Sequence, residues 1–297
     1  MPDHWTNSLF IQNGPFAGNT LENISPVSGG CIHQAWRIEL SDGQKIFAKT
    51  NHKDLLNVLE VEAKGLKALK KWTNNSLITV PEPLLVEELS GRAVLLLPWL
   101  ELSGDDQTAL GQGLALMHQK SAKHNPEKFG WEEDGYIGKG IQPGGWLANW
   151  GEYFVNMRLI PQLKIASQWG LRIEDYQAIL IALPSFLNEH QPSPSIVHGD
   201  LWGGNAAILQ DGRGVLIDPA AWWADREVDI AMTKLFGGFS KKFYAGYEKV
   251  WPLPTSAQKR VEIYNLYHLI NHANLFGGSY KEQCLRTLKT LKGSIIN

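Results

Sequence analysis

One segment constrains the fold of this chain more than any other: the run Ile196–Asn205, which reads IVHGDLWGGN, together with the aspartate Asp218 that follows it. Between them, residues 206–209 and 214–217 have the composition of two short strands, and an Asp-Gly pair separates them, which is a strong signal for a hairpin. The hairpin would place Asn205 before its first strand and Asp218 after its second. The chain must therefore fold so that this asparagine and this aspartate lie side by side.

These residue types match a known chemical need. In phosphoryl transfer to a hydroxyl group, a loop aspartate accepts the proton of the hydroxyl, an asparagine further along the loop holds one magnesium ion, and an aspartate at the next strand end holds the other. Asp200, Asn205 and Asp218 have the types and the spacing for these roles. Each alone could be an ordinary turn residue, but their coincidence, with His198 ahead, favours a catalytic loop. The sequence thus predicts a kinase that uses ATP and Mg²⁺.

A lysine and a glutamate upstream form a second, independent signal. Residues 45–49 alternate as a strand that ends at Lys49, and residues 53–72 have the periodicity of a helix. Glu62 lies on the apolar face of that helix, where a carboxylate is costly unless a cation pairs with it. Lys49 is the candidate partner, and such a pair anchors the phosphates of ATP in kinases. The alternative is that Lys49 is a surface lysine and that Glu62 lies at the edge of the apolar face.

The pair Gly29-Gly30, followed by Cys31, lies between two strand-like segments. Backbone without Cβ atoms can approach phosphates closely, so we expect these three residues to contact ATP. A glycine pair is equally typical of a plain hairpin. No G-x-x-x-x-G-K-[ST] motif occurs in the chain, which argues against a Walker-type nucleotide fold. Cys31 is either an oxidisable thiol near backbone N–H groups or a small buried apolar residue.

The order of the expected elements predicts an α+β, two-lobed, protein kinase-like fold. Residues 1–98 would form a small N-terminal nucleotide-binding lobe, with an antiparallel five-stranded sheet and one helix. Residues 99–297 would form a larger, mainly helical C-terminal lobe for catalysis and substrate binding. Residues 146–169 and 257–276 are among the helices expected there.

The lobes would meet where the strand pattern gives way to helices. Pro98, Trp99 and Leu100 lie at that change, so we expect them to form a hinge that binds the adenine of ATP. Proline has no backbone N–H but keeps its carbonyl group. The Pro98 carbonyl and the Leu100 N–H are therefore the expected backbone contacts to the base.

The composition of the chain narrows the kinds of ligand and the cellular location that can be expected. A formal net charge of −2 gives no overall attraction to nucleic acid, and the two cysteines, Cys31 and Cys284, are too few for a disulfide framework or a cysteine zinc site. No apolar run suggests a membrane span, and no signal segment is recognisable, so we expect a cytoplasmic protein that binds neither nucleic acid nor membrane. A small-molecule substrate is expected. The oligomeric state is open, with a monomer favoured.

Three further side chains are candidates for binding the substrate. Trp202 in the glycine-rich run and Trp222 after the hairpin could stack on a sugar ring, although each could equally pack its own segment onto the protein. His268 and His272 are four residues apart on an expected helix, but no third ligand accompanies them, so core or cleft hydrogen bonds are favoured over zinc. Trp202, Trp222 and His268 are therefore tentative substrate-binding residues.

Taken together, these motifs resemble the fructosamine kinase (ketosamine-3-kinase) family, a branch of the aminoglycoside phosphotransferase and choline kinase-like group. The resemblance covers nearly the whole chain. Its specific marks are SGGC at 28–31, EAKGL at 62–66, GWEEDGYIG at 130–138, HGDLWGGN at 198–205, DREVDIAM at 225–232 and YNLYHL at 264–269. It implies ATP-dependent phosphorylation of the sugar 3-hydroxyl of a ketosamine, the rearranged product of amine glycation. The phosphorylated adduct then decomposes and frees the amine.

The resemblance also implies roles for single residues. Asp200 would be the catalytic base. Lys49 and Glu62 would be the ion pair that anchors the phosphates, and Asn205 and Asp218 would be the magnesium ligands.

By the same resemblance, His198 and Asp229 would support the catalytic loop. Physical reasoning alone makes Asp225, Glu227 and Asp229 acids at a helix start, which the helix macrodipole favours. For Asp225 and Glu227 we keep that interpretation.

Two other functions stay open at this point. One is a kinase of the same fold that acts on another hydroxyl group, such as that of an aminoglycoside, choline or a homoserine-like metabolite. The other is a non-catalytic nucleotide-binding scaffold, which would be expected to have lost one of Lys49, Asp200, Asn205 or Asp218, and none is lost. The Phe-Gly that follows the metal-binding aspartate in protein kinases is absent, and a helix is expected shortly afterwards. We therefore predict no activation by phosphorylation.

Overall fold

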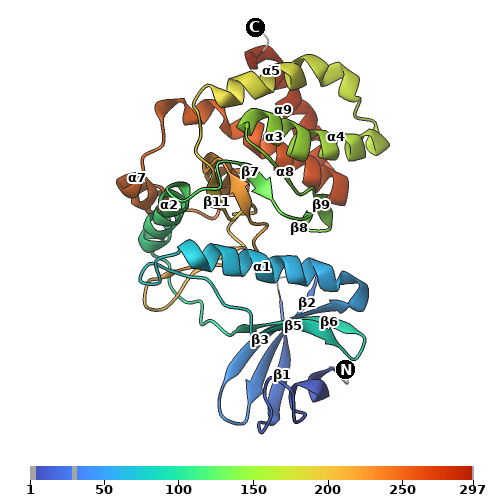
Figure 1. Cartoon of the computed structure of the whole chain (residues 1–297), viewed down its shortest axis with the longest axis vertical. Coiled ribbons are helices and arrows are strands. Elements are labelled where there is room, and N and C mark those ends of the chain that lie inside the picture. Colours follow the sequence, from blue (N-terminus) through green and yellow to red (C-terminus); the bar gives the residue numbers. More distant parts are fainter. Residues whose placement is uncertain (1–4, 29–31, 296–297) are drawn as a thin grey trace.

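The computed structural model describes residues 5–28 and 32–295. Its first part is an antiparallel sheet in the order β1-β2-β3-β6-β5. The strands are β1 (Leu21–Val27), β2 (Gln34–Leu40), β3 (Lys45–His52), β5 (Leu85–Leu89) and β6 (Arg92–Pro98). Helix α1 (Leu56–Trp72) crosses this sheet on the side that faces the rest of the molecule (Figure 1). The predicted five-stranded sheet with one helix is therefore confirmed.

The amphipathic sequence of α1 explains its position. Its buried apolar side chains recur at steps of three and four residues and pack against β6; they are Leu59, Ala63, Leu66 and Leu69. The helix begins later than predicted, because a 3-10 turn occupies Lys53–Leu55. A Cβ atom at Gly65 would stand 3.1 Å from the side chain of Pro219, so glycine there lets the segment after Asp218 approach α1 closely.

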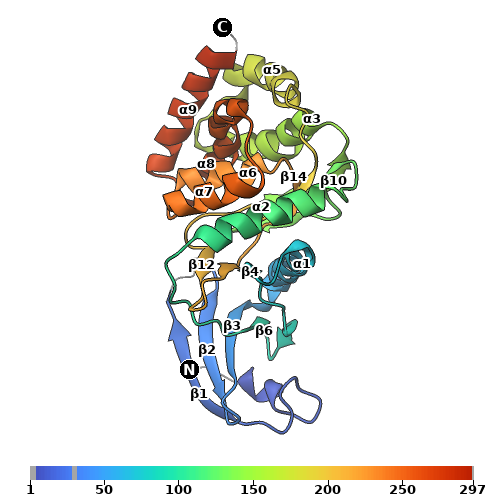
Figure 2. The ribbon, with the colours of Figure 1, turned by 90° about the vertical axis from the view of Figure 1, so that its left-hand side faces the viewer.

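The second part of the chain is mainly helical, as predicted. Its helices are α2 (Thr108–Ala122), α3 (Trp150–Phe154), α4 (Ile160–Ala166), α5 (Gln177–Asn188), α6 (Glu227–Leu235), α7 (Lys241–Val250), α8 (Val261–Phe276) and α9 (Ser279–Ile295). Figure 2 shows α2 and α7 side by side at the end that faces the sheet. In the part of the chain that the structure describes, no helix has both the length and the apolar character needed to cross a bilayer.

Small sheets surround the predicted loop. The predicted hairpin is present as β12 (Ala206–Ile208) and β13 (Gly214–Leu216), and β13 also pairs in parallel with β4 (Ile78–Thr79). A second sheet has the order β10-β7-β14-β11; its strands are β7 (Phe129–Trp131), β10 (Gly145–Leu147), β11 (Ser195–Val197) and β14 (Trp222–Ala224). A hairpin joins β8 (Gly135–Ile137) to β9 (Gly140–Gln142). Strands of three residues are too short to produce a recognisable period, so most of these were not predicted.

The single helix predicted for residues 146–169 is wrong. Strand β10 occupies its start, and α3 begins only after Asn149, whose side chain accepts a hydrogen bond from the Glu152 N–H at 2.9 Å. An asparagine in this position caps a helix and marks its beginning. A π-helical turn at Val155–Leu159 then separates α3 from α4.

Candidate active site

Asp229, from α6, holds the loop that follows β11. Its carboxylate accepts hydrogen bonds from the His198 N–H at 2.7 Å and from the Gly199 N–H at 2.9 Å. Burial alone would raise the pKa of Asp229, but the hydrogen bond from His118 and the nearby charges outweigh burial and lower it. The His198 ring also donates from Nε2 to the Ile217 carbonyl at 2.8 Å, which ties the loop to the end of β13.

His118, from α2, completes this support and was not predicted. Its Nε2 lies 3.1 Å from Asp229 Oδ2, and its Nδ1 lies 2.9 Å from the Tyr247 hydroxyl. All three side chains are buried. In the sequence, His118 directly follows the apolar stretch at 114–117, a pattern equally typical of any core histidine. Only the fold brings α2, α6 and α7 together around it.

Asn205 joins the loop that carries Asp200 to the end of the hairpin. Its amide nitrogen donates hydrogen bonds to the Asp200 carbonyl at 2.9 Å, to Asp200 Oδ2 at 3.1 Å and to the Asp218 carbonyl at 3.4 Å. These bonds occupy Nδ2, so Oδ1 is the amide atom left for another ligand. Asp218 has a left-handed backbone with φ of 54°, and its side chain is 40% exposed. An amide oxygen beside a part-exposed carboxylate is a donor set that fits Mg²⁺.

Lys49, from β3, and Glu62, from α1, form a buried ion pair. Lys49 Nζ lies 2.8 Å from Glu62 Oε1 and also contacts Asp218 Oδ1. Burial would lower the pKa of Lys49, but the charges of Glu62 and Asp218 outweigh it and raise the pKa. Together with the Asn205 hydrogen bonds, these contacts form one continuous set, in the order Glu62, Lys49, Asp218, Asn205, Asp200.

The carboxyl group of Asp200 has an unusual environment. Burial first, and the charge of Asp218 second, raise its pKa to about 7. A carboxylate in such surroundings is a stronger proton acceptor than one in water. Burial first, and the charge of Asp200 to a lesser degree, also raise the pKa of Tyr267 on α8, a buried residue that the sequence did not reveal.

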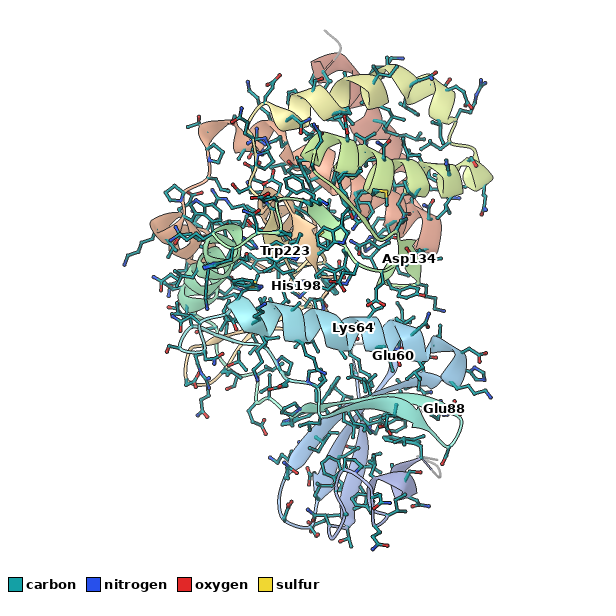
Figure 3. The ribbon with its side chains drawn as sticks, in the orientation of Figure 1. Glu60, Lys64, Glu88, Asp134, His198 and Trp223 are labelled. Carbon is teal, nitrogen blue, oxygen red and sulfur yellow. The ribbon has the colours of Figure 1, made fainter. Side chains whose placement is uncertain are left out.

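Two polar contacts tie α1 to the β8–β9 region. Lys64 Nζ lies 2.6 Å from Glu133 Oε1, and Asn57 Nδ2 donates to the Tyr136 hydroxyl at 2.6 Å. Figure 3 shows Lys64 on the side of α1 that faces the segment carrying Asp134. Because α1 also carries Glu62, these contacts help to set where the Lys49 ion pair lies relative to the loop that carries Asp200.

The expected hinge follows directly from the sheet. Pro98 is the last residue of β6 and pairs with Ile46, and the Trp99 N–H donates to the Lys45 carbonyl at 3.2 Å. The Arg37 guanidinium lies over the indole of Trp99, with its Cζ atom 5.0 Å from the ring centre.

The three residues expected to approach the phosphates, Gly29, Gly30 and Cys31, lie outside the described residues.

The tentative substrate-binding residues have very different environments. Trp202 is 39% exposed and remains available to a ligand. The structure contradicts the expected stacking role of Trp222, which is 1% exposed: its ring packs against Trp150 and Tyr153, and the Arg158 guanidinium lies 4.1 Å from its centre. It also contradicts direct ligand contact for His268, which is fully buried on α8.

Burial of His268 gives a prediction about stability. Burial, and to a lesser degree the His272 charge, lower the pKa of His268 from 6.5 to about 3, so the folded protein keeps its imidazole neutral. The unfolded chain binds this proton more tightly, so the free energy of unfolding should fall as the pH drops from 6.5 toward 3. Substitution His268→Gln should reduce that slope by up to about 1.4 kcal/mol per pH unit. Urea unfolding at pH 7, 6 and 5 measures it, with exposed His124→Gln as the control; equal slopes for wild type and His268→Gln would refute a buried neutral imidazole.

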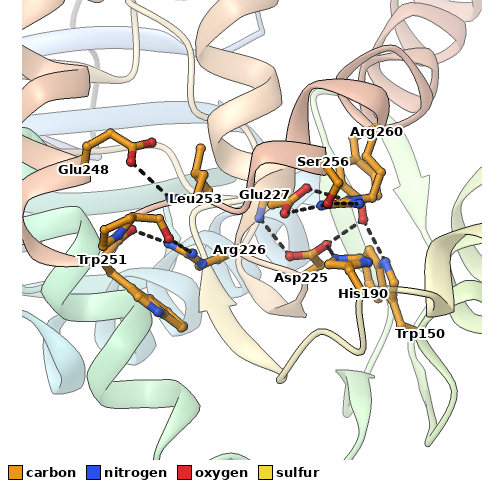
Figure 4. Close-up of polar contacts among 12 residues, drawn as sticks. Trp150, His190, Asp225, Arg226, Glu227, Glu248, Trp251, Leu253, Ser256 and Arg260 are labelled. Atoms are coloured by element: carbon orange, nitrogen blue, oxygen red, sulfur yellow. Dashed lines mark hydrogen bonds and ion pairs between the residues drawn. The ribbon is translucent and has the colours of Figure 1, made fainter.

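A second charged cluster lies at the start of α6 (Figure 4). Arg260 donates from Nε and Nη2 to the Glu227 carboxylate, both at 2.7 Å. Asp225 Oδ1 accepts the Glu227 N–H at 3.0 Å, as expected for an acid at a helix start, and its Oδ2 accepts from the Tyr264 hydroxyl at 2.6 Å and lies 2.7 Å from His190 Nε2. Arginine already neutralises Glu227, so this cluster is a structural ion network rather than a metal site.

Comparison with solved structures gives the class of protein. The chain is similar to the crystal structure of “Putative fructosamine-3-kinase” from Haemophilus somnus 129PT, with a TM-score of 0.82 and 29% identity over 92% of each chain. It shares its fold with amicoumacin kinase hAmiN, solved with AMP-PNP, Ca²⁺ and Ami, at a TM-score of 0.56 and 15% identity, over 92% of this chain and 89% of that one. The predicted kinase-like α+β fold is therefore confirmed.

Comparison of sequences identifies the family within this class. The family model described as fructosamine kinase matches residues 6–293. A protein of Synechocystis sp. named “Probable ketoamine kinase” is 41% identical over 267 residues, which are 89% of this chain and 88% of that protein. The chain therefore belongs to the fructosamine kinase family, and the resemblance seen in its motifs is confirmed.

Proposed function

We propose that this chain is an ATP-dependent ketosamine kinase that phosphorylates the sugar 3-hydroxyl of fructosamine-type or ribulosamine-type adducts. Membership of the family and the name of the Synechocystis relative support the substrate class. The observation that carries the proposal is the continuous set of contacts that joins Glu62, Lys49, Asp218, Asn205 and Asp200. Because an adduct phosphorylated at this position decomposes and releases the amine, the outcome would be deglycation.

Each residue of this set has a role in the proposal. Asp200 accepts the proton of the attacking hydroxyl group, and Lys49 anchors the phosphates while Glu62 holds its ammonium group. Asn205 Oδ1 and the Asp218 carboxylate would hold Mg²⁺, which when bound neutralises charge on the phosphates. Support for a nucleotide and a divalent ion in this fold comes from amicoumacin kinase, solved with AMP-PNP and Ca²⁺.

The proposal divides the chain into two functional regions. Residues 1–98 form the nucleotide-binding lobe, and residues 99–297 form the catalytic and substrate-binding lobe. Backbone of Pro98 and Leu100 contacts adenine; the Trp99 N–H does not, because it already donates to Lys45.

The short segment after Asp218 favours a small molecule as the acceptor of the phosphoryl group. Strand β14 begins at Trp222 and α6 at Glu227, which leaves no long segment for docking a peptide or for activation by phosphorylation. Trp202, exposed in the catalytic loop, is the residue of this region best placed to stack on a sugar ring.

An assay of ATP consumption with Mg²⁺ over a panel of acceptors tests the proposed function. The panel holds fructosamines, ribulosamines, erythrulosamines, aminoglycosides and choline. We expect turnover with one or more ketosamines and none with aminoglycosides or choline. Turnover confined to aminoglycosides or choline would favour a kinase for another hydroxyl group. ATP binding without turnover on any acceptor would favour a nucleotide-binding scaffold.

A further inference from the structure

Asn51 and His33 form a contact that the proposed roles do not use. Asn51 lies in β3, two residues after Lys49, so both side chains are on the same face of the strand. Its Oδ1 accepts a hydrogen bond from the His52 N–H at 2.8 Å, and its Nδ2 donates to the Ile32 carbonyl at 2.9 Å. Both bonds require the amide orientation that the structure has. Nδ2 also lies 3.0 Å from Nδ1 of His33, just before β2.

This contact decides where the imidazole carries its hydrogen. An amide NH₂ group can only donate, so Nδ1 of His33 must accept. A neutral imidazole that accepts at Nδ1 carries its hydrogen at Nε2. The ring is neutral because burial first, and then the charges of Lys49 and Lys139, lower the pKa of His33 to about 4 against the opposing effect of Asp218. His33 therefore presents a fixed, uncharged N–H donor.

Strand pairing locates that donor: Ala35 of β2 lies opposite Lys49 of β3, and His33, two residues before Ala35, contacts Asn51. Lys49 belongs to the candidate active site, where it contacts Asp218, and Lys139 lies in the turn between β8 and β9. A Cβ atom at Gly138, beside Lys139, would come 3.4 Å from the Ile32 side chain, which confirms that this turn meets the segment carrying His33. Among the residues the structure describes, none accepts a hydrogen bond from His33 Nε2.

We infer that His33 is a nucleotide-binding residue: its Nε2–H donates a hydrogen bond to a phosphate oxygen of bound ATP beside Lys49, and Asn51 is the positioning residue that fixes its tautomer. An N–H donor fits a phosphate oxygen, which accepts hydrogen bonds only. This inference rests on the proposed use of ATP, but not on the identity of the phosphate acceptor.

Histidine ¹⁵N NMR of the full chain tests the tautomer. The His33 signal is the one that disappears in the His33→Gln variant. In wild type, this signal should show a neutral ring protonated at Nε2. Addition of AMP-PNP should shift the Nε2 resonance, and adenosine should not. In Asn51→Asp, where a carboxylate faces Nδ1, the hydrogen should move to Nδ1. A wild-type ring protonated at Nδ1, or a signal unchanged by AMP-PNP, would overturn the inference.

Calorimetric titration of the same proteins with ATP, ADP and adenosine tests the contact. His33→Leu should weaken ATP and ADP binding about tenfold or more, because a hydrogen bond to a charged group is lost. His33→Gln, which keeps an N–H donor, should recover part of that affinity, and the exposed control His124→Leu should match wild type. Adenosine affinity should not change.

Equal losses for ATP and adenosine in His33→Leu would mean a packing role and would overturn the inference, as would wild-type ATP affinity in that variant. If wild type binds ATP but phosphorylates no ketosamine, the proposed function fails while these binding data still decide the role of His33. If wild type binds no ATP, both proposals are overturned.

Discussion

Substitution Asp200→Asn is expected to lower kcat about 10³-fold, because an amide cannot accept the proton of the attacking hydroxyl group. The KM for ATP should change little, since Asp200 has no role in anchoring the phosphates. The variant should fold at least as well as wild type: burial and the charge of Asp218 disfavour the Asp200 carboxylate, and a neutral amide removes that penalty. Steady-state kinetics together with urea unfolding separate these effects.

A matched control for this substitution is Asp211→Asn. Asp211 is an exposed carboxylate in the turn between β12 and β13, paired with Arg213 on the surface. Its kcat should equal that of wild type. If Asp200→Asn kept more than a tenth of wild-type kcat while Asp211→Asn was unaffected, Asp200 would not be the catalytic base.

Substitution Arg260→Met is expected to destabilise the protein by about 3–5 kcal/mol, because it leaves the buried Glu227 carboxylate without its partner. The two side chains are only 4% and 5% exposed, and two hydrogen bonds join them. The double variant Glu227→Met with Arg260→Met should recover much of the loss, since it removes the uncompensated charge. Urea unfolding of the three proteins at pH 7 measures the difference.

The exposed ion pair of Lys242 and Asp106 provides the control. Substitution Lys242→Met should leave the free energy of unfolding almost unchanged, because water screens both charges. An Arg260→Met variant as stable as Lys242→Met would contradict the view that the cluster at the start of α6 is a buried ion network.

Features with a local pattern could be predicted from the sequence. The apolar period of α1 predicted the helix and showed that the charged Glu62 lies on its apolar face. The Asp-Gly turn predicted the hairpin that places Asn205 and Asp218 side by side. The contact of Asp200 with Asn205 follows from their spacing in one loop. These residues could be found because their chemistry requires particular residue types at particular intervals.

Features set by distant segments could not be predicted. Trp222 seemed suited to a sugar ring by its place after β13, but packing against Trp150, far away in the sequence, places it in the core. His118 acquires its function only where α2 meets α6 and α7. The same holds for His33, whose tautomer depends on Asn51 across the sheet. Tertiary packing, rather than residue type, decides whether such a side chain is core or site.

The proposed reaction is transfer of a phosphoryl group from ATP to the 3-hydroxyl of a ketosamine. The most direct test is ³¹P and ¹H NMR of the product formed from a fructosamine or ribulosamine with Mg²⁺ and ATP, comparing wild type with Asp200→Asn. We predict a phosphate ester coupled to the proton on sugar carbon 3, formed by wild type and nearly absent with the variant. A phosphate on any other hydroxyl group, or equal product from both proteins, would contradict the proposal.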